Sequence, residues 1–213
     1  MGKPFKEELE KLSETIQWAE HQDVKRLAGF LFAENKQTPL VCIGSGGSLS
    51  ACHYAAQLYQ LCNGVLAQAM TPLQLMFAGR DIICNSKLLF LSASGKNKDI
   101  LNAIKYGVKF NETDMMSLTL RKNNPTEEML ARYPKVQRWC EDIPTEKDGF
   151  LATNSLLATF TLLSRSFDGQ HVSNIYNLES SYSKNYDFDL TTIQNFVVLY
   201  GAAGEPVAWD IES

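Results

Sequence analysis

The sequence predicts an α/β protein built on a parallel sheet. Three observations support this class: short apolar runs of strand length, segments of helical period between them, and polar loops directly after two of the runs. The runs at 40–43 and 88–91 are too short and too apolar for exposed strands, so they indicate strands buried on both faces. Because the carboxyl ends of parallel strands meet at one edge of a sheet, we expect the two loops to border a common crevice.

Helices and strands alternate along the chain. Pro72 and Pro125 fit the first turns of short helices, and Gly64 fits the end of a longer one. In order, the pattern predicts helices at 9–19 and 24–31, a strand at 40–43, a helix at 48–63, a strand at 65–70, a helix at 72–77, a strand at 88–91, a helix at 100–108, a strand at 115–120, helices at 125–132 and 151–167, a connector at 168–192 and a strand at 196–200.

Composition and charge exclude several classes of function. A net charge of −4 over 213 residues lacks the basic surface that a general nucleic-acid binder requires. No apolar run approaches the length needed to span a membrane, and the first residues lead into charged positions rather than into a secretory signal. We therefore expect a cytoplasmic protein without nucleic-acid or membrane partners.

The cysteines and histidines indicate no metal centre. The five cysteines are odd in number and form no CxxC pair, so we expect free, mostly buried thiols in a reducing compartment. A packing role is favoured over a catalytic cysteine, which would need a histidine partner. The three histidines are too scattered to suggest zinc ligands. We expect neither a metal nor a cofactor.

The two loops carry the groups that bind an anion. Small hydroxyl residues and backbone N–H groups can hold a phosphate without a strong cation, and glycine lets the backbone approach closely. The helix after each loop adds unpaired N–H groups and a positive dipole end. The candidate binding residues are Ser45, Gly46, Gly47 and Ser48 in the first loop, and Ser92, Ala93, Ser94, Gly95, Lys96 and Asn97 in the second.

Better-known phosphate loops do not fit. Leu49 occupies the third glycine position of GxGxxG, and Gln68 stands where a dinucleotide site needs an acidic residue. The second loop lacks the first glycine of a Walker A motif and has Asn97 in place of its Ser or Thr. A third polar segment, 148–155, begins the long apolar helix and fits either a helix cap or a ligand contact.

These motifs together resemble the sugar isomerase (SIS) domain family. Residues 44–48 resemble its GxGxS loop, and 91–99 resemble its S-x-S-G-x-T-x-D phosphate loop. Residues 149–155 are similar to its G-V-A-S-T-K-A segment, with Thr153 retained. The closest likeness is to the first half of tandem members, such as the isomerase part of glucosamine-6-phosphate synthase and the fructosamine deglycases. Residues 200–208 resemble the start of the second half.

The resemblance implies a three-layer αβα sandwich of the flavodoxin-like kind, with a five-stranded parallel sheet that binds a phosphosugar. It implies an SIS domain at 1–185 and the start of an incomplete second one at 186–213. The implied substrate-binding residues are Gly46, Gly47, Ser48, Ser92, Ala93, Ser94, Gly95, Asn97 and Thr153. Asn97 replaces a family Thr, Ala93 a common Gln and Asn154 a Lys, which would retune phosphate binding.

Three functions remain open at this point, and the simplest is a degenerate domain kept for oligomerisation. The other two bind a phosphosugar. In the first, the chain forms part of an aldose–ketose isomerase or deglycase that acts on a sugar phosphate. The family's catalytic glutamate would lie beyond Ser213, so no catalytic residue is assigned within the chain. The alternative is a non-catalytic module that senses a phosphosugar or nucleotide sugar. The implied partners are a small sugar phosphate and either a second copy of the chain or a second SIS domain.

Overall fold

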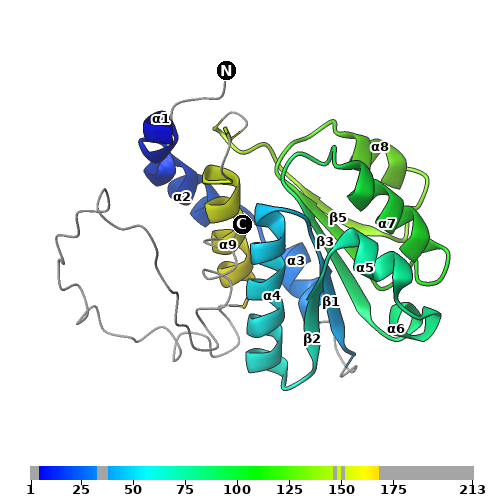
Figure 1. The fold of residues 1–213 in the computed structure, drawn as a ribbon. Helices are drawn as coiled ribbons and strands as arrows, with labels where there is room; N and C mark the ends of the chain where they lie inside the picture. The colour runs from blue at the N-terminus through cyan, green and yellow to red at the C-terminus, as the bar shows by residue number, and fades with distance from the viewer. Residues whose placement is uncertain (1–4, 33–37, 146–147, 150–151, 168–213) are drawn as a thin grey trace, which may run out of the picture.

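The five strands form one parallel sheet. The computed structural model describes residues 5–32, 38–145, 148–149 and 152–167, and places helices on both faces of the sheet (Figure 1). The strands are β1 (Leu40–Ile43), β2 (Ala67–Met70), β3 (Lys87–Ser92), β4 (Met115–Thr119) and β5 (Gln137–Cys140), in the order β2-β1-β3-β4-β5. Every neighbouring pair is parallel. The α/β class and the five-stranded parallel sheet are confirmed.

Strand β3 shows why such short runs are apolar throughout. All six of its residues are buried, and alternate side chains belong to different cores. Leu89 and Leu91 pack in the core on one face, whereas Leu88 and Phe90 pack in the core on the other. A strand covered on both faces therefore loses the polar alternation of an exposed strand.

Helices α2, α3, α4 and α9 pack in the core on the first face, and α1 precedes them in the chain. These helices are α1 (Phe5–Leu9), α2 (Leu12–His21), α3 (Lys25–Leu31), α4 (Gly47–Asn63) and α9 (Asn154–Phe167). Tyr59 and Phe167 are among the largest fully buried side chains of this core. Helix α9 contacts α2, α3 and α4, so it joins the start of the chain to the sheet layer (Figure 1).

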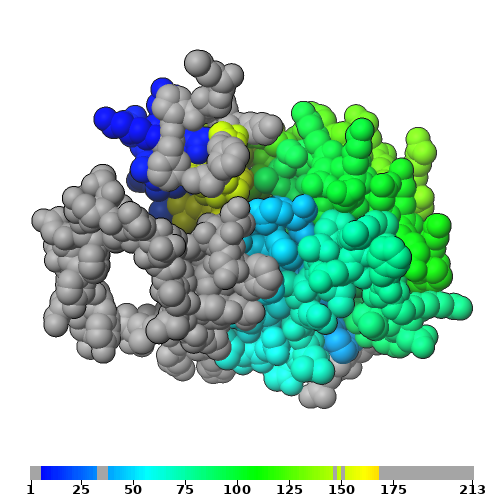
Figure 2. Space-filling view, viewed as in Figure 1, coloured from blue at the N-terminus to red at the C-terminus, as the bar shows by residue number. Residues whose placement is uncertain are grey.

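The second face is covered by α5 (Pro72–Phe77), α6 (Arg80–Cys84), α7 (Lys98–Val108) and α8 (Pro125–Leu130). The core of this face is formed by residues such as Ile83, Ile104 and Leu130. Figure 2 shows that the chain from β2 to α8 forms one continuous body beside the N-terminal helices and α9. Among the described residues, no helix is both long and apolar enough to cross a lipid bilayer.

Several sequence predictions need adjustment. Strand β5 and helix α6 were not predicted, and the strand predicted at 196–200, the connector and the second domain lie outside the described residues. All five cysteines are free as expected, but only Cys42 and Cys52 are buried, and Cys84 is exposed. The prediction of mostly buried thiols is therefore wrong, because Cys84 ends a surface helix of one and a half turns.

Candidate functional site

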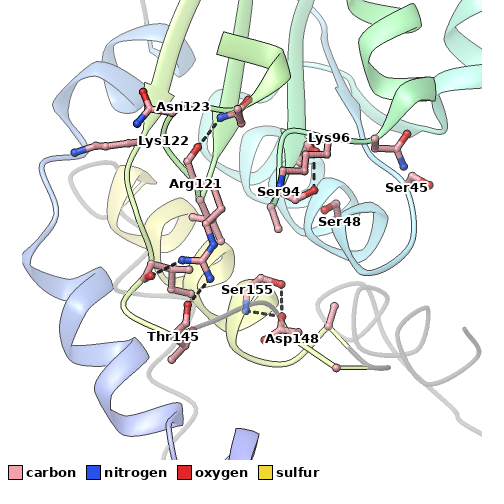
Figure 3. A pocket seen from close by; sticks show the side chains of 18 residues that line it. Ser45, Ser48, Ser94, Lys96, Arg121, Lys122, Asn123, Thr145, Asp148 and Ser155 are labelled. Carbon is pink, nitrogen blue, oxygen red and sulfur yellow. Dashed lines mark hydrogen bonds between the residues drawn. The ribbon is translucent and has the colours of Figure 1, made fainter. Parts of the chain in front are cut away.

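A cavity of about 570 Å³ opens at the carboxyl ends of the strands (Figure 3). Strand order reverses between β1 and β3, and open α/β sheets bind ligands at this switch point. The volume is within the range of small-molecule sites. The lining residues are Ser45, Ser48, Ser92, Ala93, Ser94, Lys96, Asn97, Leu120, Arg121, Lys122, Asn123, Asn124, Ile143, Thr145, Asp148, Gly149, Ala152 and Ser155.

The structure brings the two predicted loops together. Five of the nine residues implied by the family resemblance line the cavity, namely Ser48, Ser92, Ala93, Ser94 and Asn97. The other four, Gly46, Gly47, Gly95 and Thr153, do not line it. Three of those four are glycines, and their contribution is to shape the loops rather than to offer a side chain.

The loop after β3 is held rigidly by Gly95. This residue has φ of +63°, a conformation that favours glycine, and a Cβ placed on it would lie 2.1 Å from Oδ1 of Asn124. Its carbonyl accepts hydrogen bonds from Thr126, at 3.1 Å from the backbone N–H and 2.8 Å from the hydroxyl. The start of α8 therefore fixes the position of the candidate phosphate loop.

Side chains of the same loop organise the start of α7. Oδ1 of Asn97 accepts hydrogen bonds from the backbone N–H groups of Asp99 at 2.8 Å and Ile100 at 3.1 Å, as an N-cap does. Oγ of Ser94 accepts from the N–H of Lys96 at 3.3 Å. The amide oxygen of Asn97 is thus engaged, and its NH₂ group is the part that can donate to a ligand.

The loop after β1 depends on two adjacent glycines. Gly46 has φ of +57° and ψ of −141°, a backbone conformation that side chains disfavour. A Cβ on Gly47 would lie 2.5 Å from Cβ of Ala152, so the start of α4 packs directly against the segment that leads into α9. Ser48, in the first turn of α4, is half-buried at the cavity wall.

Thr153 serves the architecture of α9. Its hydroxyl donates to Oε2 of Glu8 at 2.8 Å and to Oδ1 of Asp148 at 3.4 Å. Glu8 is 4% exposed and also accepts from the backbone N–H of Gly149. The prediction of a ligand contact at Thr153 remains untested, but the observed partners account for this hydroxyl.

Asp148 supplies the cap that the third polar segment suggested. Its carboxylate accepts from the backbone N–H of Asn154 at 3.2 Å and of Ser155 at 3.0 Å, and from Oγ of Ser155 at 2.5 Å. A carboxylate in this position satisfies unpaired N–H groups and complements the helix dipole. Asp148 and Ser155 also line the cavity, so the cap and the ligand-contact interpretations of this segment are compatible.

Sequence reasoning missed the wall formed by the loop after β4. Arg121 and Lys122 line the cavity, and Arg121 donates to the carbonyl of Ile143 at 2.8 Å and to the carbonyl of Thr145. Their position directly after a predicted strand was a usable signal, because every loop at this edge of the sheet can reach the crevice. This loop contains neither glycine nor serine, the residues on which the predicted sites depended.

The charged side chains around the cavity differ in whether they already have a partner of opposite charge. Lys122 forms an ion pair with Glu141, whose hydrogen bond and negative charge raise the pKa of the lysine. Lys96 and Arg121 have no carboxylate partner among the residues that the structure describes. Within that part of the chain, no three His, Cys, Asp or Glu residues gather to hold a metal ion. The described part of the cavity wall therefore offers cations and hydroxyls, and Asp148 is the one acidic residue in it.

Comparisons with known proteins support the fold. No family model and no curated protein sequence matches the chain. Among solved structures, the tagatose-6-phosphate ketose/aldose isomerase from Escherichia coli superposes with a TM-score of 0.62 at 15% identity, over 76% of this chain and 46% of that one. The C-terminal domain of glucosamine-fructose-6-phosphate aminotransferase from Francisella tularensis gives 0.57 at 15% identity, over 76% and 49%.

A third similar structure has a length close to that of this chain. It comes from Methanococcus jannaschii, was inferred to function as a 3-hexulose-6-phosphate isomerase, and gives a TM-score of 0.58 at 14% identity, over 79% of this chain and 91% of that one. The chain thus spans about half the length of the other two proteins. On this evidence the chain has the sugar isomerase (SIS) fold of the phosphosugar isomerases.

Proposed function

We propose that this chain binds a phosphorylated sugar in the cavity, with the phosphate held between the loops at 45–48 and 92–97. The observation that carries the proposal is the meeting of four serine hydroxyls and Lys96 at the switch point of the sheet. Hydroxyls, loop N–H groups and one cation suit the several acceptor oxygens of a phosphate. The phosphosugar isomerases that share the fold support the same ligand class.

The sugar itself would lie toward Asp148 and Ser155. These residues line the cavity at the start of α9 (Figure 3), and a carboxylate accepts hydrogen bonds from sugar hydroxyls. Because Asp148 already accepts four hydrogen bonds from residues 153–155, it is held in one orientation. It therefore suits recognition better than repeated proton transfer.

We propose that the chain supplies the binding half of an aldose–ketose isomerase or deglycase. Proton transfer between neighbouring carbons requires a base with a pKa near neutral. Among the described lining residues, Asp148 is the one carboxylate and no histidine occurs. The glutamate that the family resemblance implies is not among the described lining residues, and we propose that a second SIS domain or a partner supplies it. The alternative is a sensing module. The hydrogen bonds that hold Asp148 in one orientation favour this alternative, because they suit recognition better than proton transfer.

Binding can be measured by isothermal titration calorimetry with fructose 6-phosphate, using fructose as the unphosphorylated control. Ser94→Ala removes one hydroxyl contact with the phosphate, which contributes about 1–2 kcal/mol. We expect affinity to fall about five- to thirtyfold. Ser13→Ala changes an exposed serine of α2 and should leave affinity unchanged. Equal affinity for fructose and its phosphate, or equal effects of the two variants, would refute the proposed site.

Catalysis is separated from sensing by solvent exchange. Incubation with fructose 6-phosphate in D₂O, followed by proton NMR, detects deuterium at the carbon next to the carbonyl. Because we propose that a second domain or a partner supplies the base, the assay uses the assembly isolated from cells. A sensing assembly binds the sugar without exchange, whereas an isomerase assembly replaces the hydrogen on that carbon with deuterium. The same titrations, run with light scattering, test whether a second copy is the partner. Fractionation of the cells that make the protein tests the cytoplasmic location.

A further inference from the structure

We propose that the ligand carries a second anionic group, a carboxylate or a second phosphate, which binds to Arg121 and Thr145 on the cavity wall that faces the serine loops. This inference rests on the proposed function, because the first anionic group is the sugar phosphate. Figure 3 shows Arg121 and Thr145 on one side of the cavity, with Ser48, Ser94 and Lys96 on the other. The two sites are therefore separate places for negative charge.

The guanidinium of Arg121 is fixed in place but not neutralised. It donates one N–H to the carbonyl of Ile143 at 2.8 Å and another to the carbonyl of Thr145. Three of its five N–H groups remain. Both acceptors are neutral, and no carboxylate of the described residues pairs with the arginine. A half-buried guanidinium held in this way is a preorganised partner for a planar or tetrahedral anion.

Thr145 provides an independent indication of a ligand. It is a lining residue of the cavity and only 3% of its surface is exposed, yet Oγ1 has no hydrogen-bond partner among the described residues. Buried hydroxyls almost always have a partner, so an unpaired one at a cavity wall indicates a group that arrives from the cavity. The carbonyl of the same residue accepts a hydrogen bond from Arg121, so the residue with the unpaired hydroxyl is in direct contact with the cation.

The neighbouring charges direct an anion to this wall. Lys122 is already paired with Glu141, so it competes weakly for a ligand. Asp148 repels anions at the start of α9, between the two walls in Figure 3. A single phosphate on the serine loops leaves Arg121 without a counterion among the described residues. A ligand with acidic groups at both ends satisfies both walls.

Three probes test this inference: fructose 6-phosphate, fructose 1,6-bisphosphate and 6-phosphogluconate. We expect at least one of the two probes that carry two anionic groups to bind about tenfold or more tightly than fructose 6-phosphate, which corresponds to ~1.4 kcal/mol. A preference for the bisphosphate identifies a second phosphate, and a preference for phosphogluconate identifies a carboxylate. Equal binding of all three would overturn the inference and leave the proposed function standing. Binding of none would overturn both.

Variants of Arg121 and Thr145 test whether the tighter binding of a second anionic group depends on this wall. Arg121→Gln should abolish the tenfold advantage, whereas Arg132→Gln changes an exposed arginine outside the cavity and should preserve it. Thr145→Val keeps the shape and removes an unpaired hydroxyl, so it should fold and still reduce the advantage several-fold. If Arg121→Gln fails to fold, the test depends on Thr145→Val. If Thr145→Val still binds the preferred probe tenfold more tightly than fructose 6-phosphate, the inference is contradicted.

Discussion

Replacing Gly95 by alanine tests the packing that shapes the candidate phosphate loop. The new Cβ would lie 2.1 Å from Oδ1 and 2.3 Å from Cγ of Asn124, a residue that is 1% exposed. Asn124 must therefore move. It donates to Oγ1 of Thr119 at 3.1 Å and to the carbonyl of Arg121 at 2.5 Å, and accepts from the N–H of Glu127 at 3.1 Å.

The expected cost follows from these contacts. The left-handed backbone costs alanine about 1 kcal/mol, and each of the three hydrogen bonds contributes about 1 kcal/mol, so Gly95→Ala should destabilise the fold by about 4 kcal/mol. Gly64→Ala is the matched control. Gly64 has φ of +64°, nearly the same as Gly95, but a Cβ there meets no atom within 4 Å. Its cost should be about 1 kcal/mol.

Urea unfolding followed by circular dichroism measures both variants. The double variant Gly95→Ala with Asn124→Ala removes the clashing amide, so its cost should be about 1–3 kcal/mol less than the sum of the single variants. Equal costs for Gly95→Ala and Gly64→Ala would refute the steric argument. Strict additivity in the double variant would refute the assignment of the clash to Asn124.

Two further predictions concern charged groups. Burial lowers the pKa of Lys87, whose ammonium donates to the carbonyls of Phe30 and Leu31 at the end of α3. Between that lowered pKa and the ordinary value of 10.5, the unfolded chain binds more protons, so the stability of the native protein relative to Lys87→Met should rise with pH. Urea unfolding at pH 8, 9 and 10 measures this difference, and a difference that falls would contradict it. Asp148→Asn weakens the cap of α9 and should cost about 1 kcal/mol in thermal unfolding. It should also weaken fructose 6-phosphate binding, because an amide accepts hydrogen bonds from the sugar hydroxyls less strongly than a carboxylate. Unchanged or tighter binding would contradict the proposed role of Asp148 in recognition of the sugar.

The parts of the fold that the sequence predicted are those with strong local signals. Buried strands such as β3 are continuous apolar runs, and Gly64 ends α4 in the left-handed conformation typical of helix ends. Strand β5 was missed because only Trp139 among its four residues is buried, so the edge strand has no apolar run. Its pairing with β4, a tertiary feature, defines it as a strand.

The candidate site also has one part that the sequence predicted and one part that it did not. The serine and glycine loops were predictable because glycine and hydroxyl residues after a strand have a specific local meaning. The wall of Arg121 and Thr145 was not, because it depends on hydrogen bonds between segments about twenty residues apart. The hydrogen bond between Thr153 and Glu8 joins residues that lie even farther apart in the sequence, since Glu8 belongs to α1. No local pattern encodes such contacts.

The central claim is that both loops hold a phosphate at the switch point, and amide chemical shifts test it residue by residue. Titration of ¹⁵N-labelled protein with fructose 6-phosphate should move the backbone signals of 45–48 and 94–97 together, with one dissociation constant. The signals of Gly64, at the far end of α4, and of Asn111, which follows the far end of α7, should stay in place. Shifts confined to one loop, or centred on residues outside the cavity, would contradict the account.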